Sequence, residues 1–182
     1  VTPLPRDPTC MKCGAGEAAE PGQRCIKPGL LGDSGPAMLI VGGWPTTYES
    51  KKGEPFLGAY GRKIREIVKR CWSGRAVYDF AIKCPVGDMK PNASWYSECR
   101  PYLARTARFY KYDRVLLVGR EASRAFLGRP VDVDSVEWPW AWSTRLDAPV
   151  FISRGIRSAY NTLFEREMYA QVEWACTAPR PT

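Results

Sequence analysis

Four short apolar runs, separated by segments with helical spacing, constrain the fold of this chain more than any other feature of its sequence. Each run has the length and character of a buried strand: they are residues 37–42 (AMLIVG), 76–83, 114–119 (RVLLVG) and 149–153. Helices are expected at 60–72, 94–110, 120–127 and 158–174. Such alternation predicts an α/β fold with three αβα layers and a central, four-stranded, mainly parallel sheet.

The 182 residues are expected to form a single domain with its own apolar core. Residues 1–35 contain three cysteines among many glycines and prolines, so they are predicted to be irregular and organised by a metal. Ser94 is the expected N-cap of the second helix, and the Trp-rich segment 136–142 is the expected position of an irregular insertion.

Sheets of this kind bind their ligands outside the carboxyl ends of the parallel strands. The loops that follow the four predicted strands are therefore the places to look for a site. They are residues 42–58, 84–92, 119–122 and 153–157.

The charge balance favours a polyanionic partner. Lys and Arg number 27 against 19 Asp and Glu, a net charge of +8. Nucleic acid is the usual partner of such a surface, and a generic basic surface is the alternative. The chain has no histidine, which excludes imidazole general bases, histidine-based zinc sites and Ser–His or Cys–His nucleophile pairs.

No apolar stretch approaches the roughly 20 residues that a membrane span needs. The first eight residues are polar and proline-rich, unlike a secretory signal. We therefore expect an intracellular, cytoplasmic and nucleoid-associated protein that binds DNA, contacts no membrane and is monomeric.

Four of the seven cysteines have a spacing that suits a metal centre. Cys10 and Cys13 form a CxxC pair, and Cys84 and Cys99 follow at the end of a strand and within the next helix. Four thiolates in this pattern can ligate a [4Fe–4S] cluster or a zinc ion. Cys25, Cys71 and Cys176 are interpreted as ordinary residues, and an intracellular setting argues against disulfides.

With this cysteine spacing, the chain resembles family four of the uracil-DNA glycosylase superfamily. Further similar segments occur in the family's order: residues 37–45 (its strand and GExPG loop), 53–61 (G-x-PFVG-x-xG), 83–85 (KCxP), 98–103 (E-x-x-C-x-P-x-L, with the glutamate shifted), and 118–128 (LGxxA…LLG). The resemblance covers roughly residues 10–165.

The resemblance implies an enzyme that flips a nucleotide out of DNA and cleaves its base–sugar bond. It implies that Cys10, Cys13, Cys84 and Cys99 hold a [4Fe–4S] cluster. Phe56 matches the aromatic residue that stacks on the base, with a core aromatic as the alternative.

Glu49 matches an acidic residue that positions or polarises the attacking water, and a solvated loop glutamate is the alternative. The backbone amides of Gly42, Gly43 and Trp44 are further candidates to face the base.

Three departures from the family concern the base. Gly43 stands where the family has a glutamate, and Phe80 stands where it has the asparagine that reads uracil. The family's late His-Pro motif has no counterpart in the matching segment, residues 151–157. Because phenylalanine offers no paired donor and acceptor, ordinary uracil excision is not expected.

Other side chains at these loops would take over the missing roles. Arg154 is a candidate to stabilise the departing anionic base, and Asp79 and Ser153 are candidates for polar contacts with it. Phosphate contacts are expected from basic residues on the same loops: Lys51, Lys52, Lys90, Arg154 and Arg157.

Three functions remain open on this basis. The first, which we favour, is a glycosylase for a noncanonical, modified pyrimidine, such as the decorated pyrimidines of some viral genomes. The second is an ordinary uracil-DNA glycosylase with rearranged recognition. The third is a DNA-binding protein that kept the fold and cluster but lost catalysis.

Overall fold

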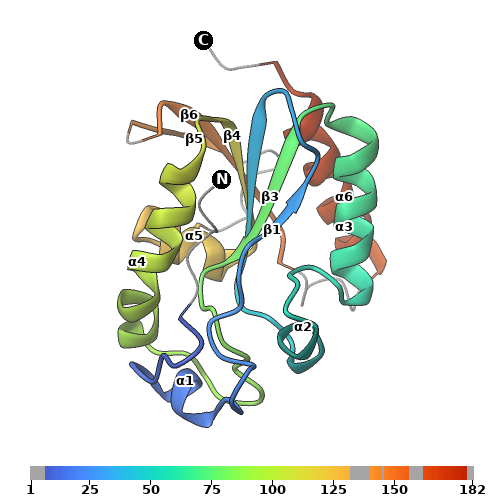
Figure 1. Cartoon of the computed structure of the whole chain (residues 1–182). Helices are drawn as coiled ribbons and strands as arrows, with labels where there is room; N and C mark the ends of the chain where they lie inside the picture. Colours follow the sequence, from blue (N-terminus) through green and yellow to red (C-terminus); the bar gives the residue numbers. More distant parts are fainter. Residues whose placement is uncertain (1–6, 132–139, 145, 156–161, 180–182) are drawn as a thin grey trace.

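The computed structural model describes residues 7–131, 140–144, 146–155 and 162–179, and it places one six-stranded sheet between two layers of helices (Figure 1). The strands are β1 (Gly29–Leu31), β2 (Ala37–Gly42), β3 (Arg75–Phe80), β4 (Tyr112–Val118), β5 (Trp140–Ser143) and β6 (Ala148–Ser153). The helices are α1 (Gly14–Ala18), α2 (Thr47–Lys52), α3 (Ala59–Cys71), α4 (Ala93–Phe109), α5 (Arg120–Leu127) and α6 (Thr162–Thr177).

The sheet has the order β1-β3-β2-β4-β6-β5. Its four central strands are parallel and are the four that the sequence predicted, which confirms the three-layer α/β fold. The expected number of strands was too small, because the short strands β1 and β5 pair antiparallel along the two edges. An edge strand is bonded on one side only, so its sequence need not be continuously apolar.

Alternate residues of the central strands supply two separate cores, as the two-residue period of a strand requires. Leu39 and Val115 belong to the core that lies under α4 and α5. Ile40 and Leu116 belong to the opposite core, under α3 and α6. The predicted apolar face of α3 is buried at Ile64, Ile67 and Val68, whereas Cys71 is only partly buried.

The helix ends follow local capping rules. α5 spans the predicted residues, and the left-handed Gly128 ends it. α4 is capped by Asn92 rather than by Ser94: the Asn92 side chain accepts hydrogen bonds from the amides of Ser94 and Trp95. Asparagine and serine are comparable caps, and two residues separate them, so the sequence did not resolve the position.

The N-terminal segment is more regular than predicted, since it contains α1 and β1. The predicted Trp-rich insertion lies outside the described residues up to residue 139, and its last residues belong to β5. The expected beginning of the last helix, residues 158–161, also lies outside the described part of the chain.

Candidate functional site

The direction in which successive parallel strands are added to the sheet reverses between β2 and β4. From β2 the chain forms β3 on one side, and it then adds β4 and β6 on the other side. Ligands of open α/β sheets bind outside the carboxyl ends of the strands at such a reversal. α1 and α2 lie at this end of the sheet (Figure 1), as do the described residues of the loops that the sequence singled out.

Two stacked aromatic rings lie at the ends of β2 and β3. The rings of Phe56 and Phe80 are 5.2 Å apart between centroids and only 7° from parallel. Both side chains are buried, Phe56 at 0% exposure and Phe80 at 2%. The expected base-stacking ring is therefore covered by Phe80.

The backbone around Phe56 is built for this close packing. A Cβ on Gly42 would stand 2.9 Å from the Phe80 ring and 3.0 Å from the Phe56 ring, so a side chain there would displace both. Gly61 gives the backbone of Phe56 the same room, because a Cβ there would be 2.7 Å from it. Phe56 has a φ of +59°, which is strained for a residue with a Cβ and is typical of functional positions.

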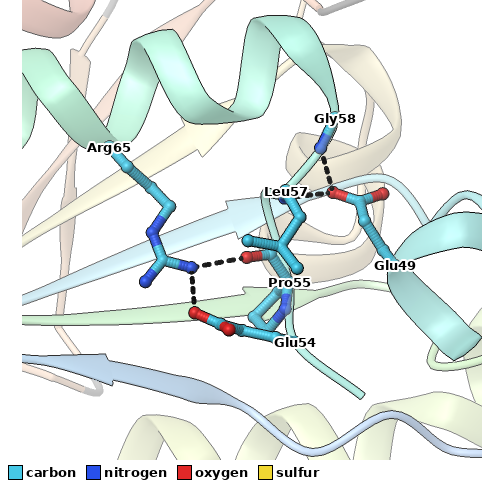
Figure 2. Close-up of polar contacts among 6 residues, drawn as sticks. All are labelled: Glu49, Glu54, Pro55, Leu57, Gly58 and Arg65. Carbon is cyan, nitrogen blue, oxygen red and sulfur yellow. Dashed lines mark hydrogen bonds and ion pairs between the residues drawn. The ribbon is translucent and has the colours of Figure 1, made fainter. Parts of the chain in front are cut away.

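The Phe56 loop (residues 53–58) is held from two sides (Figure 2). On one side, Arg65 of α3 donates to Glu54 Oε1 at 2.6 Å and to the Pro55 carbonyl at 3.0 Å. On the other side, Glu49 Oε1 accepts from the amides of Leu57 at 2.9 Å and of Gly58 at 3.4 Å. These contacts fix the strained Phe56 between them.

The carboxylate of Glu49 connects the start of α2 with the Phe56 loop. Its second oxygen, Oε2, accepts from the backbone amide and the hydroxyl of Thr46, both at 2.8 Å, which completes a capping box on α2. Each carboxylate oxygen thus accepts two hydrogen bonds, which fills the four lone-pair positions that could hold a water. The residue is 5% exposed, so the alternative of a solvated loop glutamate is wrong.

We predict that Glu49→Ala lowers the free energy of unfolding by about 3 kcal/mol, because buried amides of α2 and of the Phe56 loop lose their acceptor. A chain of this size should then melt about 6–12 °C lower. The matched control is Thr46→Ala, which removes one cap and should cost about 1 kcal/mol. A Glu49→Ala protein that melts like the wild type but has lost activity would instead make Glu49 catalytic.

Two further candidates for base contacts are buried. Asp79 is 1% exposed, and its Oδ1 accepts from the Phe80 amide at 2.8 Å and pairs with the ammonium group of Lys83, which is also buried. Ser153 is 0% exposed and donates to the Arg154 carbonyl at 3.2 Å. Asp79 is thus engaged within the protein, in an ion pair that the sequence did not indicate.

Arg154 is held against α6. Its Nε lies 2.6 Å from Glu167 Oε2, and its backbone amide donates to Gln171 Oε1 at 2.8 Å. The side chain is 11% exposed. A contact with an anionic base or a phosphate would have to compete with Glu167.

The loop after β2 brings its two glycines to the site edge. The carbonyls of Gly42 and Gly43 accept from the amides of Ala81 and Ile82 at 2.8 and 2.9 Å, which extends the pairing of β2 with β3. Trp44 is partly buried against the core under α4 and α5.

The sequence analysis missed a carboxylate at this edge. Glu121 lies in the first turn of α5, and its Cβ is 3.5 Å from the position that a Cβ on Gly43 would take. Its Oε2 accepts a hydrogen bond from the Tyr96 hydroxyl of α4. Glu121 falls within the segment that resembles the family's LGxxA element, but nothing local in the sequence connects it with Tyr96.

The expected phosphate-binding lysines are all exposed: Lys51, Lys52 and Lys90. The first two end α2, beside the Phe56 loop. Arg157 lies outside the described residues.

The four predicted cysteine ligands are all buried, at 8%, 8%, 2% and 4% exposure for Cys10, Cys13, Cys84 and Cys99. The Cys99 thiol donates a hydrogen bond to Cys13 and thereby lowers the pKa of Cys13 to about 6. Burial raises the pKa of Cys84 to about 11, and the charges of Cys10 and Cys13 contribute to this rise.

Cys25, which the sequence analysis interprets as an ordinary residue, also lies in this neighbourhood. Its amide donates to Cys84 Sγ at 3.2 Å, and its φ is +45°. As placed, the Cys and acidic side chains of the described residues form no group of three or more that would hold a metal ion by themselves.

The helices in the described part of the chain are too short or too polar to cross a membrane.

The sequence model of the Uracil DNA glycosylase superfamily matches residues 28–172. A Type-4 uracil-DNA glycosylase from Pyrobaculum aerophilum is 29% identical over 93 residues, which are 50% of this chain and 47% of that protein. The alignment thus spans about half the length of the relative.

Proposed function

Because this chain belongs to the uracil DNA glycosylase superfamily, we propose that it is a DNA glycosylase that flips out and excises a modified pyrimidine, leaving an abasic site. The observation that carries this proposal is the Phe80 ring at the end of β3, stacked on Phe56. The relative from Pyrobaculum aerophilum bears the name of a uracil-DNA glycosylase, which supports base excision as the reaction class.

Phe80 argues against uracil as the natural base. A uracil reader donates to one edge atom and accepts from the next, and an aromatic ring does neither. The glutamate that Gly43 replaces and the histidine that has no counterpart here are two side chains that would limit the size of the base. A pyrimidine with extra polar groups would find partners in the loop amides and in Arg154, once Arg154 leaves Glu167.

A base that replaces Phe80 on the face of Phe56 would make up for the lost stacking, while moving the buried Phe80 ring carries its own cost in burial. An aromatic pair of this kind contributes about 0.5–1.5 kcal/mol beyond burial. Stacking of a base on an aromatic side chain contributes about 1–3 kcal/mol. The flipped base therefore regains the stacking energy that is lost when the Phe80 ring turns away.

We also propose a [4Fe–4S] cluster, held by Cys10, Cys13, Cys84 and Cys99. Their common burial and the amide that Cys25 directs at Cys84 Sγ suit thiolate ligands, because amide hydrogen bonds to the sulfurs are part of the environment of iron–sulfur clusters. The cluster would join the N-terminal segment to the end of β3 and to α4.

DNA is the proposed partner, bound by phosphate contacts of Lys51, Lys52 and Lys90. We predict that DNA affinity falls steeply with salt, and that Lys51→Ala weakens binding to every sequence and lowers the salt slope by about one. Titrations of labelled duplex DNA at several salt concentrations measure both effects.

Lys69→Ala is the control, since Lys69 lies in the last turn of α3, towards the opposite end of the sheet. An affinity that does not change between low and moderate salt would contradict this electrostatic account.

A DNA-binding protein without catalysis is the second candidate, favoured by the burial of Phe56 and by the filled lone pairs of Glu49. Base release separates the two functions. Duplex and single-stranded DNAs that carry different bases are incubated with the protein, and abasic sites are detected by strand cleavage in alkali. We expect multiple-turnover release of at least one modified pyrimidine. Tight binding without release of any base would favour the second candidate.

A further inference from the structure

The carboxyl ends of β2 and β4 flank the point at which the winding of the sheet reverses, where such folds bind their ligands. Gly43 follows β2, and Glu121 follows β4 after Gly119 and Arg120. A Cβ on Gly43 would lie 3.5 Å from the Glu121 Cβ, so the two segments lie side by side. The carboxylate at this end of the sheet is therefore supplied by the first turn of α5, while the loop after β2 has none at position 43.

Three acidic residues lie near the ends of β2, β3 and β4, and they differ in how open they are. Glu49 and Asp79 are 5% and 1% exposed; Glu49 accepts from backbone amides, and Asp79 Oδ1 accepts from the Phe80 amide and pairs with Lys83. The side chain of Glu121 is 31% exposed. Of these three, Glu121 is the one that a water or a substrate can reach.

Two neighbours hold the Glu121 carboxylate in place. The Tyr96 hydroxyl donates to Oε2, and Arg124 Nη1 lies 3.7 Å from the same oxygen. The burial of Tyr96, together with its hydrogen bond to Glu121, raises the pKa of this tyrosine well above its ordinary value. Tyr96 therefore keeps its proton and remains a donor, and both of these contacts are made with Oε2.

We propose that Glu121 is the carboxylate that activates the attacking water, with Tyr96 as its positioning residue. The assignment rests on the proposed glycosylase function. The water oxygen bonds to C1′ of the deoxyribose, and its proton passes to Glu121 and then to solvent. The C1′–N bond breaks, its electron pair leaves with the base, and the base anion takes up a proton from solvent.

The test compares Glu121→Gln with Glu66→Gln, an exposed glutamate on α3 that pairs with Lys63. Single-turnover base release is measured with enzyme in excess, on the modified duplex that the wild type cleaves fastest. Glu121→Gln should lower the rate about 100-fold or more with DNA affinity and melting temperature unchanged. Glu66→Gln should react like the wild type.

Glu121→Ala allows a second measurement, the rescue of its rate by formate. A purely structural role of Glu121 would give no such rescue. Added formate should restore part of its rate by supplying the missing carboxylate, and Glu66→Ala should not respond to formate. Wild-type rates in Glu121→Gln, or a Glu121→Ala protein that formate does not rescue, would overturn the assignment. A wild type that releases no base at all would instead refute the proposed function, and this assignment with it.

Discussion

Phe80→Asn is expected to raise the rate of uracil release by about 100-fold or more over the wild-type protein. The substitution removes the ring that covers Phe56 and places an amide at the end of β3. An asparagine amide both donates and accepts, so it can pair with two neighbouring atoms on the edge of uracil. Sites that lack such a partner reject the corresponding substrate by large factors.

Phe80→Leu is the matched control, because leucine has nearly the shape of asparagine without its amide. Both variants uncover Phe56 and lose core packing, at a cost of a few kcal/mol. Release of uracil by Phe80→Asn alone would confirm that the amide is the missing element. An equal gain in uracil release in both variants would show that the Phe80 ring only blocks access to Phe56. No gain in either would remove Phe80 from the account of specificity.

Cys84→Ala is expected to abolish the bound cluster and to lower the melting temperature by about 10 °C or more. The side chain is 2% exposed, and it accepts a hydrogen bond from Cys25 in the N-terminal segment. Loss of the cluster would remove one link between that segment and the end of β3, while β1 would stay paired with β3. Anaerobically purified wild-type protein should be brown and contain about four irons per chain, as a [4Fe–4S] centre requires.

Cys71→Ala is the control for a cysteine outside the cluster. Cys71 is partly buried at the end of α3, so the change should cost about 1 kcal/mol and leave the iron content unaltered. Colourless protein with one zinc would refute the iron–sulfur assignment while keeping the ligands. Equal stability of the two variants would contradict the ligand role of Cys84.

The parallel core of the sheet could be predicted because each central strand is buried on both faces. Such strands are continuous apolar runs, and these are visible without tertiary information. The edge strands could not be predicted in this way. β1 is three residues long and lies in a segment rich in glycine and proline, and β5 alternates exposed tryptophans with smaller residues. Their pairing depends on strands that are distant in the sequence.

The positions of the candidate site residues followed from the strand ends, but their partners did not. The sequence places Glu49 and Asp79 beside the expected pocket, yet it does not reveal the four donors on Glu49 or the ion pair of Asp79 with Lys83. Glu121 was missed because its contacts join segments that are distant in the sequence. Its hydrogen bond to Tyr96 connects α5 with α4, and its approach to Gly43 connects α5 with the loop after β2.

The measurement that tests the central claim most directly is wild-type base release from duplexes that differ only in the target base. The series contains uracil, 5-hydroxymethyluracil, 5-hydroxymethylcytosine and the glucosylated form of the last, each at one position of the same sequence. We expect release of at least one substituted pyrimidine at a rate about 100-fold or more above that of uracil. Efficient release of plain uracil, with the substituted bases left in place, would contradict the claim.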